Sequence, residues 1–208
     1  INSKRYPKAL KMIHNPPVVL YYKGREISKV HEKSIGCVGT RDITEFGVNA
    51  VVKLVPSLVA EGFTIISGLA EGVDAYSHKV CLENNGVTIA VLAHGLDYIY
   101  PKSNEFLAEQ IIHNGGTLVS EYPPGTRADK FRFVHRNRIV SGLAKGLLVF
   151  ECKAKSGTMH TVNFSIEQNK PVFCPKPSVI TDTTSGPAYL IEKQKAIGIP
   201  STNAYDLL

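Results

Sequence analysis

The chain has 208 residues, and its 24 Lys and Arg residues against 18 Asp and Glu residues give a formal net charge of +6. This length suits one domain with a substantial core, and the basic balance favours a polyanionic partner. No apolar run approaches the ~20 residues of a membrane span, and no signal-peptide core is present, so we expect a cytoplasmic protein with no membrane partner.

Short apolar runs alternate with segments of helical pattern, as in a parallel sheet that helices cover on both faces. In chain order, the expected strands are residues 18–22, 34–38, 64–67, 88–92, 117–120, 146–150 and 172–174. The expected helices are residues 8–13, 45–60, 75–84, 104–113, 137–143, 158–168 and 188–195. The pattern predicts a doubly wound, mostly parallel α/β core at 34–175, with a leading segment at 1–33 and a packed extension at 176–208.

Small, flexible residues follow three of the expected strands and open turns into helices. These turns are Gly39-Thr40-Arg41, Ser67-Gly68 and Ser156-Gly157. Ligands of open α/β sheets bind beyond the carboxyl ends of the strands, and helix N-termini at that edge favour anions. Glycines also make ordinary tight turns, but the Ser67-Gly68 and Ser156-Gly157 turns on one sheet edge would together suit a polyanion.

Residues 130–138 read Lys-Phe-Arg-Phe-Val-His-Arg-Asn-Arg, without an acidic residue. Lys130 and its neighbouring arginines suit phosphates, while Phe133 offers a flat face on which an unpaired base stacks. The alternative is a solvated basic loop with one phenylalanine in the core. Arg136 and Arg138 also have two readings, as DNA contacts or as partners of Glu121 or Asp97.

Standard catalytic and cofactor motifs are missing from the sequence. It has no Gly-x-Gly-x-x-Gly after a strand, no P-loop and no Gly-x-Ser-x-Gly, so we expect neither an enzyme nor a bound cofactor. Its four cysteines show no Cys-x-x-Cys spacing, so no metal site is expected. Asp74 and His78 stand four residues apart on an expected helix, where we expect them to pair.

An ordered set of motifs resembles the DprA/Smf family of DNA-processing proteins. The set begins with Tyr6-Pro7 and the 17–21 segment, and it continues through Val38–Arg41, Ser67–Asp74 with His78, Gly95–Asp97, Tyr100-Pro101, Ser120–Pro123, Arg136–Val140 and Ser156-Gly157. The motifs follow the family's order and cover most of residues 6–175.

The resemblance implies an extended Rossmann-like domain that binds single-stranded DNA as a homodimer. It also implies a role in natural transformation, in which the protein protects incoming single strands and helps to load the recombinase RecA. The DNA-contacting positions carried over from the family are Gly39, Thr40, Arg41, Ser67, Gly68, Lys130 and Phe133.

One departure from the family pattern suggests a competing function. Glu71 stands where the family usually has Arg or Lys, and an acid suits a ribose better than a row of phosphates. The alternative is therefore a Rossmann-like protein that binds or hydrolyses a nucleotide derivative at the same sheet edge. A third possibility is a scaffold that binds only protein partners.

Overall fold

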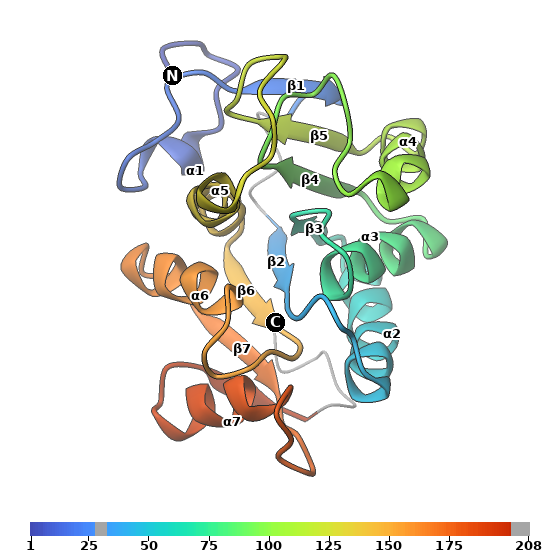
Figure 1. The fold of residues 1–208 in the computed structure, drawn as a ribbon, viewed down its shortest axis with the longest axis vertical. Coiled ribbons are helices and arrows are strands. Elements are labelled where there is room, and N and C mark those ends of the chain that lie inside the picture. Colours follow the sequence, from blue (N-terminus) through green and yellow to red (C-terminus); the bar gives the residue numbers. More distant parts are fainter. Residues whose placement is uncertain (28–32, 201–208) are drawn as a thin grey trace.

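Apolar runs form the strands of one eight-stranded sheet in the computed structural model, which describes residues 1–27 and 33–200 (Figure 1). The central strands β2 and β4 are buried along their whole length, as expected of a sheet covered on both faces. The strands are β1 (Tyr21–Gly24), β2 (Ser34–Val38), β3 (Thr64–Ser67), β4 (Thr88–Leu92), β5 (Thr117–Ser120), β6 (Gly146–Val149), β7 (Val172–Pro175) and β8 (Ile197–Ile199).

The strand order is β1-β5-β4-β3-β2-β6-β7-β8, and every pair is parallel except β1 with β5. The chain runs outward from β2 to β5 and then crosses back to place β6 on the other side of β2. In doubly wound sheets, ligands bind in the crevice where the strand order reverses in this way. The predicted fold class is confirmed, and the reversal places a crevice beyond β2 and β6.

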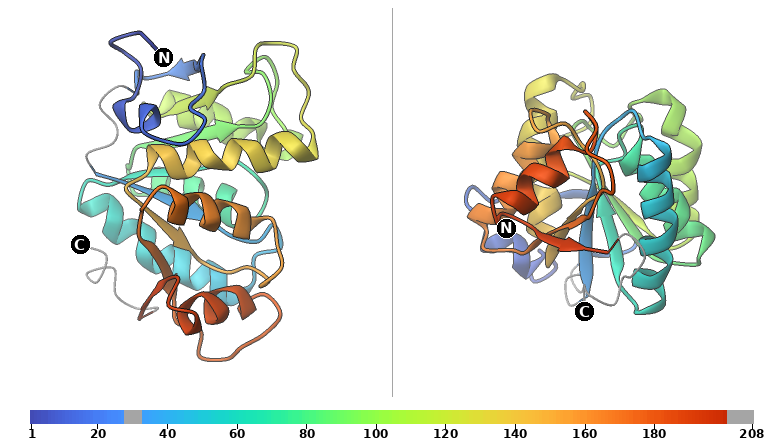
Figure 2. Two further views of the ribbon diagram at one scale, coloured as in Figure 1. Left: turned by 90° about the vertical axis from the view of Figure 1, so that its left-hand side faces the viewer. Right: turned by 90° about the horizontal axis from the view of Figure 1, so that it is seen from below.

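Helices cover both faces of the sheet (Figure 2). Helices α2, α3 and α4 lie on one face, and α1, α5, α6 and α7 lie on the other. Their bounds are α1 (Lys8–Lys11), α2 (Glu45–Ala60), α3 (Val73–Glu83), the 3-10 helix η1 (Lys102–Asn104), α4 (Glu105–His113), α5 (Lys130–Leu143), α6 (Thr158–Glu167) and α7 (Ser185–Glu192). No helix in residues 1–27 and 33–200 has the length and apolar character needed to cross a lipid bilayer.

Several predicted elements differ from the structure: the helix expected at 188–195 lies at Ser185–Glu192, other bounds shift, and one strand was missed. Strand β1 begins at Tyr21 rather than at residue 18, because pairing starts only opposite Ser120, where β5 ends. Helix α5 begins at Lys130 rather than at residue 137, because Asp129 accepts backbone hydrogen bonds and caps it. Strand β8 was missed because it has only three residues, which take part in the sheet by pairing with β7.

Candidate nucleic-acid interface

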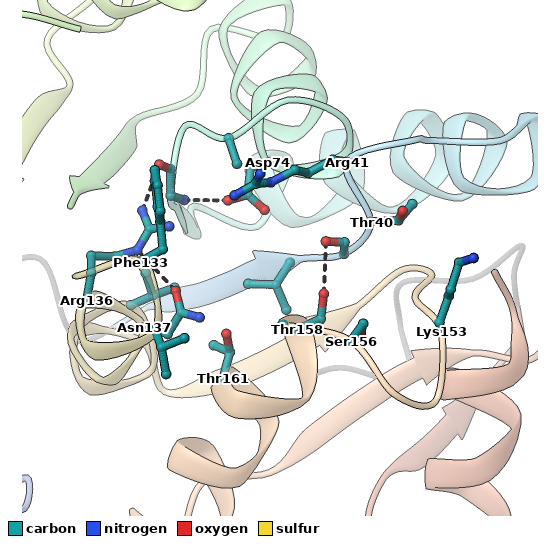
Figure 3. A pocket seen from close by; sticks show the side chains of 17 residues that line it. Thr40, Arg41, Asp74, Phe133, Arg136, Asn137, Lys153, Ser156, Thr158 and Thr161 are labelled. Atoms are coloured by element: carbon teal, nitrogen blue, oxygen red, sulfur yellow. Dashed lines mark hydrogen bonds between the residues drawn. The ribbon is translucent and has the colours of Figure 1, made fainter. Parts of the chain in front are cut away.

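A pocket of about 310 Å³ opens beyond the carboxyl ends of β2, β3 and β6, at the β2–β6 junction where the strand order reverses. In Figure 3, Phe133 and Arg136 approach it from α5, Arg41 from the loop after β2, and Ser156 and Thr158 from the start of α6. The lining residues are Val38, Gly39, Thr40, Arg41, Gly68, Ala70, Asp74, Phe133, Val134, Arg136, Asn137, Val140, Lys153, Ser156, Gly157, Thr158 and Thr161.

Hydrogen bonds to Glu151 and Val73 fix the loop after β2, which carries Arg41. The buried carboxylate of Glu151 accepts hydrogen bonds from the Thr44 amide at 2.6 Å and from the Thr44 hydroxyl at 2.7 Å. The Thr40 amide donates to the Glu151 carbonyl at 2.8 Å, and the Thr40 carbonyl accepts from the Val73 amide at 3.0 Å. Arg41 is therefore an exposed cation on a well-anchored turn.

Gly68 lines the pocket, whereas the preceding Ser67 does not, and the polar groups of both residues have partners within the protein. The Ser67 hydroxyl is buried and donates to the Cys37 carbonyl at 2.6 Å. The Gly68 amide donates to the Asp74 carboxylate at 3.1 Å. The sequence predicted that these two residues cradle a phosphate, whereas in the structure their donors stabilise the strand exit itself.

Arg136 is buried at the wall of the pocket and supports it through hydrogen bonds. Its guanidinium donates to the Gly68 carbonyl at 2.7 Å and to the Val91 carbonyl, and its Nε donates to Asn137 Oδ1 at 3.1 Å. Burial lowers the pKa of Arg136, while the nearby Asp74 opposes that shift. Burial raises the pKa of Asp74, and Arg136 counteracts this rise. The two groups therefore support each other's charged forms under the site.

Arg138 also has an internal partner. Its guanidinium makes a two-pronged ion pair with the Glu121 carboxylate, at 2.8 Å and 2.7 Å, and its Nε donates to the Asn15 carbonyl at 3.0 Å. This is one of the two roles that the sequence left open. The pair joins α5 to the end of β5 and to the N-terminal segment.

Phe133 and Arg41 meet at the mouth of the pocket. The Arg41 guanidinium lies over the Phe133 ring, 5.4 Å from its centroid, and the Tyr100 ring lies 5.8 Å from the same ring. Phe133 is partly exposed, which leaves ring surface available to a ligand. Lys130 is exposed one helical turn earlier and does not line the pocket, and its ammonium lies 5.3 Å from the centroid of Phe131.

The start of α6 completes the opposite wall. The Thr158 hydroxyl donates to the Gly39 carbonyl at 3.0 Å, which ties this wall to the β2 turn. Gly157 precedes the helix and has open space around the position of a side chain. The Ser156 hydroxyl oxygen is buried and has no hydrogen-bond partner within the described residues.

The expected Asp74–His78 pair is wrong. Asp74 is engaged with the Gly68 amide, whereas His78 Nδ1 lies 2.6 Å from the Thr88 hydroxyl inside the protein. The Thr88 hydroxyl donates to the Ile65 carbonyl, so His78 Nδ1 donates to Thr88. The two side chains lie on one helix but face different strand ends, which sequence spacing alone does not reveal.

The sequence model of the DNA recombination-mediator protein A family matches residues 1–207. The chain belongs to this family. It is 40% identical to DNA processing protein DprA of Bacillus subtilis over 193 residues, which are 93% of this chain and 65% of that protein. It spans between 43% and 66% of the lengths of four curated relatives.

Two solved structures of the DprA family are similar to this fold. The X-ray structure of DprA from Streptococcus pneumoniae has a TM-score of 0.89 and 36% identity, and the match covers 100% of this chain and 71% of that one. The DprA of Helicobacter pylori has a TM-score of 0.86 and 29% identity, with coverage of 97% and 90%. The latter structure concerns that protein's single-stranded DNA binding mode.

Some residues of this DprA-family site were not predicted to be site residues, although Tyr100 and Asn137 lie within the family motifs. Asn137, Thr161 and Lys153 line the pocket, and Tyr100 contacts Phe133. Lys153 pairs with Asp182 at 2.5 Å, across a long sequence separation that no local pattern indicates. Glu71, whose acid favoured a nucleotide ligand, is not among the lining residues and accepts a hydrogen bond from the Ser103 hydroxyl at 3.3 Å. The nucleotide alternative thus loses the residue that supported it.

Proposed function

We propose that this protein binds single-stranded DNA across the pocket, as a member of the DprA family. The observation that carries the proposal is the contact between Arg41 and Phe133, which combines a cation for phosphate with a ring for a base. Preference for single strands follows, because paired bases do not present their faces for stacking.

In this proposal the strand contacts the two walls of the pocket. Arg41 binds one phosphate, and the Ser156–Gly157 turn receives another at the N-terminus of α6, where amides and the helix dipole favour anions. Phe133 stacks on a base, and Lys130 attracts the backbone one helical turn away. Arg136, Arg138, Ser67 and Gly68 act from below by holding the walls in place.

Titration of a labelled oligothymidine against single variants tests these assignments. We expect Phe133→Ala to weaken binding by about 1–3 kcal/mol, or roughly 5- to 150-fold in Kd, because one stacking interaction is lost. Arg41→Ala and Lys130→Ala should weaken binding and each reduce the slope of log Kobs against log salt by about 0.7.

Two exposed residues far from the pocket provide matched controls. Arg25 follows β1 beside the start of β5, at the opposite edge of the parallel strands, and Phe106 lies on α4 with an exposed ring. Arg25→Ala and Phe106→Ala should bind like the wild type. Wild-type affinity in Arg41→Ala, Lys130→Ala and Phe133→Ala alike, with the fold intact by circular dichroism, would refute the assignment.

The proposal extends to the physiology implied by family membership. The protein would protect single strands in the cytoplasm during DNA uptake and mediate their transfer to RecA, acting as a homodimer and through binding rather than catalysis. All four cysteines are buried free thiols, which suits a reducing compartment. Failure to accelerate RecA assembly on strands coated with single-strand-binding protein would contradict the mediator role.

A further inference from the structure

Aromatic rings and cations recur as pairs beyond the pocket. The Arg127 guanidinium lies 5.3 Å from the centroid of Tyr98, the Lys130 ammonium lies 5.3 Å from that of Phe131, and the Arg132 guanidinium lies 5.6 Å from that of Tyr122. These residues belong to the segment after β4, the segment after β5 and the first turns of α5.

The first part of this series joins the pocket directly. The Tyr100 ring contacts Phe133 at 5.8 Å and is 49% exposed. Two residues earlier, the Tyr98 hydroxyl accepts a hydrogen bond at 2.5 Å from the amide of Ala128, which lies two residues before α5. The path from the pocket therefore runs from Phe133 to Tyr100, and on to Tyr98 with Arg127.

A contact within the protein fixes the orientation of the Tyr98 ring, whereas the Arg127 and Lys130 side chains are exposed. Tyr98 packs on His94 with 4.5 Å between ring centroids, so its orientation is fixed from behind. Arg127 and Lys130 are exposed, and neither has a carboxylate partner in residues 1–27 and 33–200. Arg132 differs, because Asp129 holds it at 2.7 Å.

We propose that Tyr100, Tyr98 and Arg127 form a second binding segment, the stacking track, which holds the nucleotides that leave the pocket. The inference rests on the proposed function and deepens it, because it extends the DNA-binding site over the segments after β4 and β5. A base takes the place of the guanidinium on Tyr98, and Arg127 turns on its flexible stem to a phosphate.

An acidic residue beside the track limits its attraction for phosphate. Asp97 is exposed, and its Oδ1 accepts a hydrogen bond from the Gly125 amide at 3.0 Å. This carboxylate therefore partly offsets the charge of Arg127, the cation of the track. Stacking, rather than charge, supplies most of the added affinity, so the extra binding of longer strands depends weakly on salt.

The length dependence of binding tests the track. Single-stranded binding sites span about 4–16 nucleotides, so oligothymidines of about 4 and about 12 nucleotides separate the pocket from the pocket plus track. The wild type should bind the longer strand about tenfold or more tightly. Tyr100→Ala and Arg127→Ala should each lose about fivefold on the longer strand, while Arg127→Ala leaves the shorter strand unaffected.

Two further measurements separate stacking from a structural role. Tyr100→Phe keeps the ring, so it should bind the longer strand as the wild type does. A 5-iododeoxyuridine placed near one end of the longer strand should crosslink under ultraviolet light to the tryptic peptide 80–102, which contains Tyr98 and Tyr100. Arg25→Ala and Phe106→Ala remain the controls.

The outcomes distinguish this inference from the proposed function. If Tyr100→Ala and Arg127→Ala bind both lengths like the wild type, while Arg41→Ala and Phe133→Ala bind both weakly, the track is refuted and the pocket stands. Equal wild-type affinity for both lengths also refutes the track. If Arg41→Ala and Phe133→Ala bind both lengths normally, the proposed function itself fails.

Discussion

Gly68 and Arg136 depend on each other at the floor of the pocket. A β-carbon on Gly68 would overlap the guanidinium of Arg136, which donates to the Gly68 carbonyl. Glycine at this position is therefore explained by packing against a buried cation. The sequence motif indicated a phosphate-binding turn, but it gave no information about an arginine 68 positions away.

Gly68→Ala should lower the free energy of unfolding by about 1–3 kcal/mol, the usual cost of inserting a methyl group into a packed site. Gly157→Ala is the matched control, because a β-carbon there meets no atom within 4 Å and its φ of −59° suits any residue. That control should change stability by less than about 0.5 kcal/mol. Urea denaturation measures the free energy of unfolding of both variants. Equal values for the two would contradict the supporting role assigned to Arg136.

His78 makes stability depend on pH. Burial lowers its pKa from 6.5 to about 3, and the nearby Arg136 adds to the shift. Below pH 6.5 the unfolded chain binds a proton that the native protein does not accept until about pH 3. The free energy of unfolding therefore falls as the pH decreases through this window, by up to about 1.4 kcal/mol per pH unit from this residue.

His78→Gln removes this titration. Urea denaturation of both proteins at several pH values between 7.5 and 4.5 should give a steeper acid loss for the wild type, while the carboxyl groups common to both proteins cancel in the difference. Parallel pH profiles would show that His78 does not remain neutral in the native state.

At the scale of elements, the largest error of the sequence-based prediction was the start of α5. The strands β2 to β5 were predicted with correct bounds, because buried runs of four or five residues between turn residues leave little choice. The start of α5 was missed, since its aromatic and basic residues lack the spacing of an amphipathic helix. Its signal was Asp129, whose carboxylate accepts from the amides of Phe131 and Arg132 at 2.8 Å and 3.0 Å.

The candidate site was predictable only where its residues act locally. Arg41, Phe133 and Ser156 were identified from composition and strand position, and the structure brings all three to one pocket. The Glu151 carboxylate at Thr44 and the Arg136 contact with Val91 join segments 107 and 45 residues apart. Such partners follow from the strand order, which a single sequence does not state.

At the scale of the whole molecule, the leading and closing segments each add an edge strand. β1 pairs with β5 at one edge and β8 pairs with β7 at the other, so residues 21–24 and 197–199 extend the sheet. The central strands then place the pocket at the reversal point, between helices from both halves of the chain.

The proposed homodimer gives a further prediction at this scale. Light scattering over a range of protein concentrations should show a mass near twice 22.7 kDa, which falls toward the single-chain value on dilution. A mass of one chain at every concentration would remove the dimer from the proposal while leaving the pocket untouched.

Arg136 has one more consequence. From α5, its guanidinium binds the Gly68 carbonyl after β3 and the Val91 carbonyl near the end of β4, so the pocket is already shaped before DNA binds. A strand entering the pocket meets a surface already in shape, so free and bound backbones should superpose closely. Capture is then governed by diffusional encounter, and its speed should rise with DNA concentration without levelling off at a slow isomerisation.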